Sequence, residues 1–253
     1  MMGPAKKRIL LVLILLLAGL PACKKNQVRL FNINGLTMGT SYSIRALWRP
    51  QPGLTPESAK SGLRDRVAER LEELNRLFST FRPDSEISAF NRAPENEWFQ
   101  ISPQTSLVLS RALEISRLTG GAFDITVAPL VKMWGFWTEE KPSSRPSDEQ
   151  IRTTLAETGY SFLEIAVEKL ELRKLKPGIM IDLAAIAKGF AVDEIAVLLE
   201  AEGYTDFLVE IGGEVKARGR NDKKNLWYHL AGWQKKAPHV AEQLKETVLQ
   251  PNV

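Results

Sequence analysis

The chain has 253 residues, of which 44% are hydrophobic and 25% charged, and its formal net charge at pH 7 is +4. This length and apolar content suit one large folded domain or two smaller ones, and they exclude a disordered or fibrous protein. No basic stripe interleaved with aromatic residues occurs in the body of the sequence, which excludes the usual pattern of a nucleic-acid-binding protein.

The N-terminus has the layout of an export signal. A positively charged stretch at residues 6–8 precedes an apolar run, Ile9 to Ala18, that is too short to span a bilayer comfortably. The only cysteine, Cys23, comes after this run and directly behind the small residue Ala22. A lone cysteine excludes an intramolecular disulfide, so the folded protein depends on its hydrophobic core.

The segment from Leu20 to Cys23 resembles the bacterial lipoprotein cleavage box. That resemblance implies that residues 1–22 are a lipoprotein signal peptide and that Cys23 carries lipids on its thiol and amine. Residues 23–30 are then an anchor and linker, and residues 31–253 the folded domain. A proline is uncommon within this box, so cleavage by ordinary signal peptidase and an uncleaved anchor stay open as alternatives.

The first part of the chain predicts a hairpin and then a long helix. Val28 to Ile33 and Ser41 to Leu47 alternate as two strands around a loop rich in glycine and hydroxyl groups, Gly35 to Thr40. That loop is either a plain turn or a place where the backbone approaches a ligand. Thr55 caps an amphipathic helix that leads into an ordered loop from Phe78 to Asn91. The aromatic residues of this loop indicate either a surface packing cluster or one wall of a pocket for a flat ring.

The middle of the chain predicts two more helices. Ser102 caps a helix that ends at Gly120, with the residues from Leu109 to Ile115 supplying its inward face. Asp124 then follows a double glycine, a pattern that by itself indicates a turn. Ser147 caps a shorter helix that ends at Gly159, after a polar loop that we expect to be exposed.

The next part of the chain predicts a junction between a strand and a helix. Two or three strands are expected between Phe162 and Asp182, and a helix with one apolar side follows to about Glu202. Free backbone N–H groups and the helix dipole favour an anion at such a junction, and Lys188 on the first turn adds a positive charge. The alternative is an ordinary connection with a capping aspartate and a solvated lysine.

The order of the predicted elements favours an α+β fold. A strand from Phe207 to Ile211 is joined by a double-glycine turn to a partner from Val215 to Arg218. Strands and helices are mixed without strict alternation, so we expect a single mixed sheet with flanking helices rather than a doubly wound sheet. The sequence contains no P-loop and no dinucleotide fingerprint, and its two histidines lack metal-ligand spacing.

Five groups of residues together carry a resemblance to a known family. They stand in this order: Met38-Gly39-Thr40, Ser79-Thr80-Phe81 with Asp84 to Ile87 and Asn91, Gly120 to Asp124, Asp182 to Gly189, and Gly212-Gly213-Glu214. The sequence from about Gly35 to at least Gly219 resembles the ApbE-type FAD:protein FMN transferases. Each motif alone is weak, and the signal lies in their common order.

The resemblance implies the residues of the site. Met38 and Phe81 are expected to line the FAD site, and Ala122, Phe123 and Asp124 to hold the dinucleotide. Asp182 and Lys188 match FAD contacts of the family. Ala185 matches a position whose backbone carbonyl binds Mg²⁺, and a carbonyl oxygen is a natural ligand for this hard cation.

The resemblance also implies an activity and its partners. The family cleaves FAD in a Mg²⁺-dependent reaction, joins the FMN half by a phosphoester bond to a threonine or serine of a target protein, and releases AMP. Targets carry an Asp-x-x-Thr/Ser-type acceptor, as in subunits of sodium-pumping NADH:quinone reductase. We therefore expect a lipid-anchored transferase on the periplasmic face of a bacterial membrane, with no nucleic-acid partner.

The chain departs from the family pattern at its C-terminal side. The family continues with a Thr-Ser-Gly-Asp segment, a histidine-containing strand and an Asp-Ala-x-x-Thr motif that supplies magnesium ligands, and none of these is present here. We expect a fragment, a truncated product or one part of a split protein that lacks the C-terminal third of the domain. The catalytic residues are accordingly unknown and expected beyond Val253, and neither His229 nor His239 is assigned a role.

Other functions stay open on the sequence alone. Without the C-terminal motifs, the chain fits a periplasmic lipoprotein that binds FAD without transferring FMN, or an FAD pyrophosphatase that releases FMN and AMP. An interaction or structural lipoprotein, in which the same loops only pack, is a third class.

Overall fold

A computed structural model describes residues 27–136 and 144–227 of the chain. The predicted signal peptide, Cys23 and most of the predicted polar loop lie outside these residues, as do His229 and His239. No helix of the described residues is long and apolar enough to cross a membrane.

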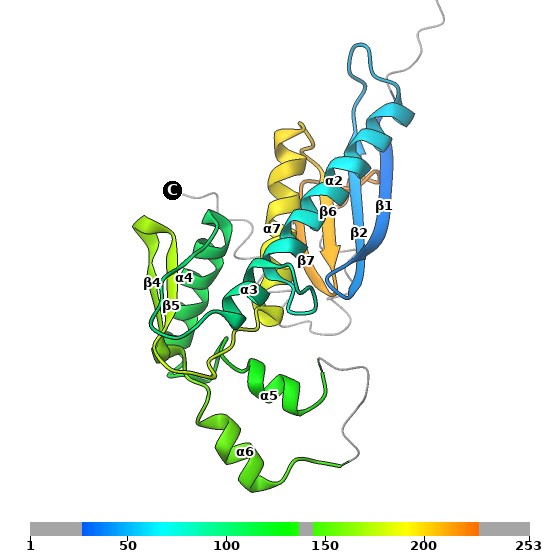
Figure 1. The fold of residues 1–253 in the computed structure, drawn as a ribbon. Helices are drawn as coiled ribbons and strands as arrows, with labels where there is room; N and C mark the ends of the chain where they lie inside the picture. Colours follow the sequence, from blue (N-terminus) through cyan, green and yellow to red (C-terminus); the bar gives the residue numbers. More distant parts are fainter. Residues whose placement is uncertain (1–26, 137–143, 228–253) are drawn as a thin grey trace, which may run out of the picture.

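The described residues contain helices and strands in a mixed order (Figure 1). The strands are β1 (Arg29–Thr37), β2 (Thr40–Trp48), β3 (Phe99–Gln100), β4 (Leu163–Ala166), β5 (Glu171–Lys174), β6 (Phe207–Ile211) and β7 (Glu214–Arg218). The α-helices are α2 (Pro56–Phe78), α3 (Glu86–Arg92), α4 (Pro103–Leu118), α5 (Ala128–Met133), α6 (Asp148–Leu155) and α7 (Ala184–Ala201). Two 3₁₀ turns, Tyr160–Phe162 and Val167–Lys169, flank β4.

The larger sheet has the strand order β1-β2-β6-β7, and each neighbouring pair is antiparallel. Phe31 and Ile33 of β1 point into the core while Asn32 and Asn34 face solvent, because successive side chains of a strand point to opposite faces. Helices α2 and α7 lie side by side against this sheet (Figure 1). The apolar sides of these two helices and one face of the sheet form most of the core.

The smaller sheet has the order β3-β5-β4 and is also antiparallel. Leu163 and Leu172 from this sheet belong to the same core as Ile44 from the larger sheet. The two sheets therefore share one core, and Leu47, Leu208 and Trp227 form a second, smaller cluster. The predicted α+β class is confirmed, but the strands form two antiparallel sheets instead of the single mixed sheet that the sequence predicted.

The starts of α2, α4 and α6 were predicted correctly, whereas α7 begins at Ala184, two residues before the predicted Ile186. Thr55, Ser102 and Ser147 each accept a hydrogen bond from the backbone N–H three residues ahead, as N-cap side chains do. The stop of α4 at Gly120 is confirmed, because α4 ends at Leu118, Thr119 is its C-cap and Gly120 follows with a φ of +60°. The end of α6 was placed too late, because α6 ends at Leu155 and not at Gly159. The strand from Phe207 to Ile211 has the predicted bounds.

Three other local predictions were wrong. The segment from Phe78 to Asn91 was expected to be a loop, but it contains α3, which Ser85 caps at its start. Ile115 of α4 was expected to face inward and is exposed. The stretch before Asp182 is not a strand, because its pairing consists of one isolated parallel bridge between Met180 and Val127. In each case the tertiary surroundings outweigh the local pattern.

The core position of α2 leads to a prediction. Leu63 of α2 is fully buried, whereas Leu118 at the end of α4 is 80% exposed. We expect Leu63→Ala to lower the free energy of unfolding by about 3 kcal/mol, because it removes buried methyl groups and leaves a cavity. The matched variant Leu118→Ala should change it by less than about 0.5 kcal/mol. Denaturant unfolding measures both, and equal losses would contradict this placement of α2.

Candidate functional site

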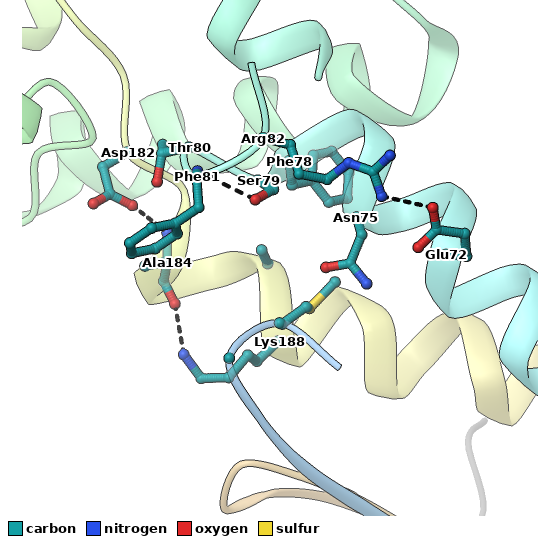
Figure 2. A pocket seen from close by; sticks show the side chains of 13 residues that line it. Glu72, Asn75, Phe78, Ser79, Thr80, Phe81, Arg82, Asp182, Ala184 and Lys188 are labelled. Atoms are coloured by element: carbon teal, nitrogen blue, oxygen red, sulfur yellow. Dashed lines mark hydrogen bonds and ion pairs between the residues drawn. The ribbon is translucent and has the colours of Figure 1, made fainter. Parts of the chain in front are cut away.

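A cavity of about 450 Å³ opens where four segments of the chain meet. The segments are the β1–β2 turn, the C-terminal end of α2, the residues directly after α2, and the start of α7 (Figure 2). Its lining residues are Met38, Gly39, Glu72, Asn75, Phe78, Ser79, Thr80, Phe81, Arg82, Asp182, Ala184, Ala187 and Lys188. Four residues that the sequence predicted for a ligand site, Met38, Phe81, Asp182 and Lys188, are thus brought together.

Met38 reaches the cavity through a tight turn. The predicted loop is a two-residue connection in which Met38 and Gly39 both have positive φ, +48° and +70°. Such turns follow the twist of a hairpin, but a side chain other than glycine is strained there. In this turn the Met38 side chain lies in the cavity wall, and a strained residue at a cavity favours the ligand-site interpretation of the turn over the plain one.

Phe81 has an exposed aromatic ring, and hydrogen bonds fix the backbone segment that carries it. Its side chain is 71% exposed at the rim of the cavity, while its N–H donates to the Ser79 hydroxyl at 3.2 Å. The carbonyl of Ser79 accepts hydrogen bonds from the hydroxyls of Ser85 and Ser88 in α3. The ring is therefore presented to solvent from a fixed backbone, as a wall for a flat apolar ligand would be.

Asp182 lies directly before α7 and is only 8% exposed. Its N–H donates to the carbonyl of Ile125 at 2.8 Å, and its Oδ1 accepts from the N–H of Ala184 at 2.7 Å. The N–H groups of Ile186 and Ala187 donate to the carbonyl of Leu183. These bonds take up several of the N–H groups at the start of α7, and anion binding by this helix end stays a prediction.

Lys188 supplies the positive charge of the cavity. It lies one turn into α7, and its Nζ donates to the carbonyl of Ala184 at 2.9 Å (Figure 2). Among the described residues it forms no ion pair. Gly212 packs close to its stem, because a Cβ on Gly212 would lie 3.0 Å from Cδ of Lys188 and 2.8 Å from Cγ2 of Thr40.

Arg82 is a second cation in the wall, but its charge is balanced locally. It pairs with Glu72 at 2.6 Å and with Asp84 at 3.1 Å. The hydrogen bond from Arg82 is the largest cause that lowers the pKa of the Glu72 carboxyl and also that of the Asp84 carboxyl. Within the part of the chain that the structure describes, Lys188 is therefore the cation of the lining without an ion pair, and the carboxylate of Asp182 lines the same cavity.

Asn75 is a lining residue that the sequence reasoning missed. It sits one helical turn before the end of α2, and its Nδ2 donates to the Thr37 hydroxyl and to the carbonyl of Leu71, both at 3.0 Å. It therefore ties α2 to the strand that leads into the Met38 turn. Its signal in the sequence is a polar residue among the apolar residues at the end of an amphipathic helix.

The comparisons with known proteins agree with this arrangement. The model of the ApbE family matches residues 38–244. This chain belongs to the ApbE family. The FAD:protein FMN transferase of Vibrio cholerae is 40% identical over 219 residues, which cover 87% of this chain and 62% of that protein. The Escherichia coli K12 protein of the same name is 33% identical over 198 residues, covering 77% and 54%.

Solved structures of the family share the fold. The flavin transferase ApbE from Vibrio cholerae matches with a TM-score of 0.73 and 38% identity, over 79% of this chain and 63% of that one. The Pseudomonas stutzeri flavinyl transferase ApbE in its apo form matches with a TM-score of 0.71 and 32% identity, over 79% and 64%. The chain thus spans about 54% to 62% of the length of these two curated relatives.

Three residues that the ApbE resemblance assigned to dinucleotide binding do not line this cavity. Ala122 is exposed, and Phe123 packs against the core. The carboxylate of Asp124 accepts hydrogen bonds from the N–H and hydroxyl of Thr126, both at 2.7 Å, and from the N–H of Tyr160 at 2.9 Å. In this structure Asp124 therefore holds a loop, and its contact with a dinucleotide stays a prediction.

The described residues do not form a complete magnesium site. Ala185 lies in the first turn of α7 and lines a separate hollow of about 330 Å³ with Ile186 and Gly189. Within residues 27–136 and 144–227, no three His, Cys, Asp or Glu side chains come together to hold a metal. A carbonyl oxygen needs several further oxygen ligands to bind Mg²⁺. The donor set of the described part therefore fits the ion only in part.

The close packing of Gly212 leads to a prediction for the ApbE fold. Gly212 and Gly120 have almost the same positive φ, +58° and +60°, but nothing lies within 4 Å of a Cβ built on Gly120. Alanine pays the same backbone strain at both positions, about 1 kcal/mol. Gly212→Ala should destabilise the protein by about 1–3 kcal/mol more than Gly120→Ala, because it also pushes on Thr40 and Lys188. Thermal or denaturant unfolding of the pair tests this, and equal losses would refute the contact.

Proposed function

We propose that this chain is the FAD-binding part of an FAD:protein FMN transferase and that FAD binds in the cavity between α2 and α7. One observation carries the proposal: the exposed ring of Phe81 and the side chain of Met38 line the same cavity as Lys188, a cation that forms no ion pair within residues 27–136 and 144–227. FAD has a flat apolar ring system and a doubly charged pyrophosphate, so it matches both walls. The names of the relatives support this choice of ligand.

The apolar wall binds the ring end in this proposal. Covering Phe81 with an isoalloxazine removes apolar surface from water, and ring contacts add about 0.5–1.5 kcal/mol beyond burial. The ring needs little reorganisation to bind, because the Ser79 carbonyl behind it is already held by two hydroxyls. Preorganisation of this kind raises affinity by lowering the cost of ordering.

The cation faces the pyrophosphate. Lys188 is a donor with mobile N–H groups, and Ala184 takes one of its hydrogen bonds. The remaining groups are available to phosphate oxygens, where a charge-assisted hydrogen bond is strong. The FAD contact that the resemblance assigns to Asp182 stays part of this proposal, and the carboxylate also accepts from the N–H of Ala184 in the first turn of α7, the helix that carries Lys188.

The proposed reaction is a transfer between two oxygens. A threonine or serine hydroxyl of the target attacks the phosphorus of the FMN half, the bond from that phosphorus to the AMP phosphate oxygen breaks, and AMP leaves. The hydroxyl proton passes to a base that we do not assign among the described residues. Positive charge near the pyrophosphate stabilises the negative charge that builds up on the leaving group.

The remaining parts of the proposal rest on the resemblance. The reaction depends on Mg²⁺, to which Ala185 contributes its backbone carbonyl. The target protein carries an acceptor of the Asp-x-x-Thr/Ser type, as a subunit of sodium-pumping NADH:quinone reductase does. The protein lies in the periplasm with Cys23 lipidated, and the lysines before the apolar run and the cysteine after it support this location.

The charge of Lys188 yields the sharpest binding test. Lys188→Met keeps the stem and removes the ammonium, so we expect the dissociation constant for FAD to rise at least about tenfold, measured by quenching of flavin fluorescence. Lys216→Met is the control, because Lys216 is a lysine on β7 that pairs with Asp193 outside the cavity. If both variants bind FAD like the parent, the cavity is not the pyrophosphate site.

A transfer assay separates the proposed function from two alternatives. This chain and, as a positive control, the Vibrio cholerae relative are each incubated with FAD, Mg²⁺ and a domain carrying the acceptor motif, and the products are analysed by mass. Addition of FMN to the acceptor with release of AMP by this chain is the result expected of a transferase. Bound but intact FAD with this chain, beside transfer by the relative, would show that this chain binds FAD without transferring FMN, and free FMN with AMP would indicate a pyrophosphatase. The described residues supply only part of a set of metal ligands, and this observation is the reason to test whether the protein is a lipoprotein that binds FAD without transferring FMN.

A further inference from the structure

The stretch from Ile179 to Asp182 carries the start of α7 but belongs to no sheet. Ile179 and Ile181 are fully buried, and the pairing of this stretch with other backbone is limited to the Met180 bridge and the bond from the Asp182 N–H to Ile125. Buried backbone N–H and C=O groups need partners, so the remaining groups must be satisfied by side chains.

Asn91 supplies these partners for Ile181. Its Oδ1 accepts from the N–H of Ile181 at 2.7 Å, and its Nδ2 donates to the carbonyl of the same residue at 2.9 Å. The two residues are 90 positions apart in the chain. One side-chain amide thus exchanges both hydrogen bonds with one residue, as the backbone of a neighbouring antiparallel strand would.

Lys174 strengthens the same junction. Its buried Nζ donates to the carbonyl of Asn91 at 3.0 Å and to the carbonyl of Ile179 at 3.3 Å. It therefore joins the backbone of Asn91 to the stretch that the Asn91 side chain also holds.

Helix α3 connects this junction to the other wall of the cavity. Ser85 at its start and Ser88 in its first turn bind the carbonyl of Ser79, which lies two residues before Phe81. Asn91 near its end binds Ile181, which lies one residue before Asp182. A single seven-residue helix therefore holds the backbone of both walls.

We propose that Asn91 is a positioning residue. Through Ile181 it fixes the distance between the start of α7, which carries Lys188 and follows Asp182, and the segment that carries Phe81. This inference rests on the proposed FAD site for its functional meaning, whereas the contact itself does not. Asparagine is required because its short side chain offers one donor and one acceptor together. Aspartate keeps the acceptor but places a carboxylate oxygen against the carbonyl of Ile181, and alanine leaves both groups of Ile181 without this partner.

The first measurement needs no ligand. Hydrogen exchange is followed in the whole chain by comparing the protection of the Ile181 amide with that of the Val209 amide in β6. We expect this ratio to fall at least about tenfold in Asn91→Ala and to fall less in Asn91→Asp, which retains the acceptor but loses the donor. Val67→Ala in the core of α2 is the matched control, because it destabilises the whole protein and should leave the ratio unchanged. An unchanged ratio in Asn91→Ala would refute the junction.

The second measurement tests the positioning role. The dissociation constant for FAD should rise about tenfold in Asn91→Ala, rise less in Asn91→Asp, and stay at the parent value in Val67→Ala. If Asn91→Ala loses the exchange protection of the Ile181 amide but binds FAD with the dissociation constant of the parent, the positioning role of Asn91 is refuted. If the parent itself does not bind FAD, the proposed function fails, and the junction is then judged by hydrogen exchange alone.

Discussion

The cavity depends on how one buried backbone stretch, Ile179 to Asp182, is captured from distant parts of the chain. Its partners are the side chains of Asn91 and Lys174, the carbonyl of Ile125 and one isolated bridge to Val127, and not a regular strand. Because a buried backbone group without a partner costs free energy, these contacts determine where the stretch can lie. Helix α7 begins at its end, so the position of Lys188 follows from the same bonds.

The rest of the structure supports this stretch through packing. Helices α2 and α7 bury their apolar sides on the larger sheet and against each other, and this brings the end of α2 beside the start of α7. The β1–β2 turn closes the cavity because Asn75 ties α2 to Thr37, next to Met38. The site therefore lies where the ends of several segments come together, and each end is bonded to a residue that lies elsewhere in the sequence.

The charged side chains of the cavity differ in whether they already have a partner of opposite charge. Arg82 is neutralised by Glu72 and Asp84, and Asp182 is occupied with capping α7. Lys188 forms no ion pair within residues 27–136 and 144–227. A cation without an ion pair in the same lining as an exposed aromatic ring suits a ligand that carries an aromatic ring and phosphate, as the FAD in the names of the ApbE relatives does.

The sequence by itself determined the α+β class, the starts of α2, α4 and α6, the β6 strand and the family. These features follow from short-range signals, namely capping residues, apolar periodicity and the order of the motifs. It also singled out Met38, Phe81, Asp182 and Lys188 as residues of one site. It did not reveal α3, the roles of Asn75 and Asn91, or the loop-holding role of Asp124. Only the tertiary structure decided these. The sequence shows that a residue is polar, but it does not show whether the side chain bonds to water, to a ligand or to a backbone group 90 residues away.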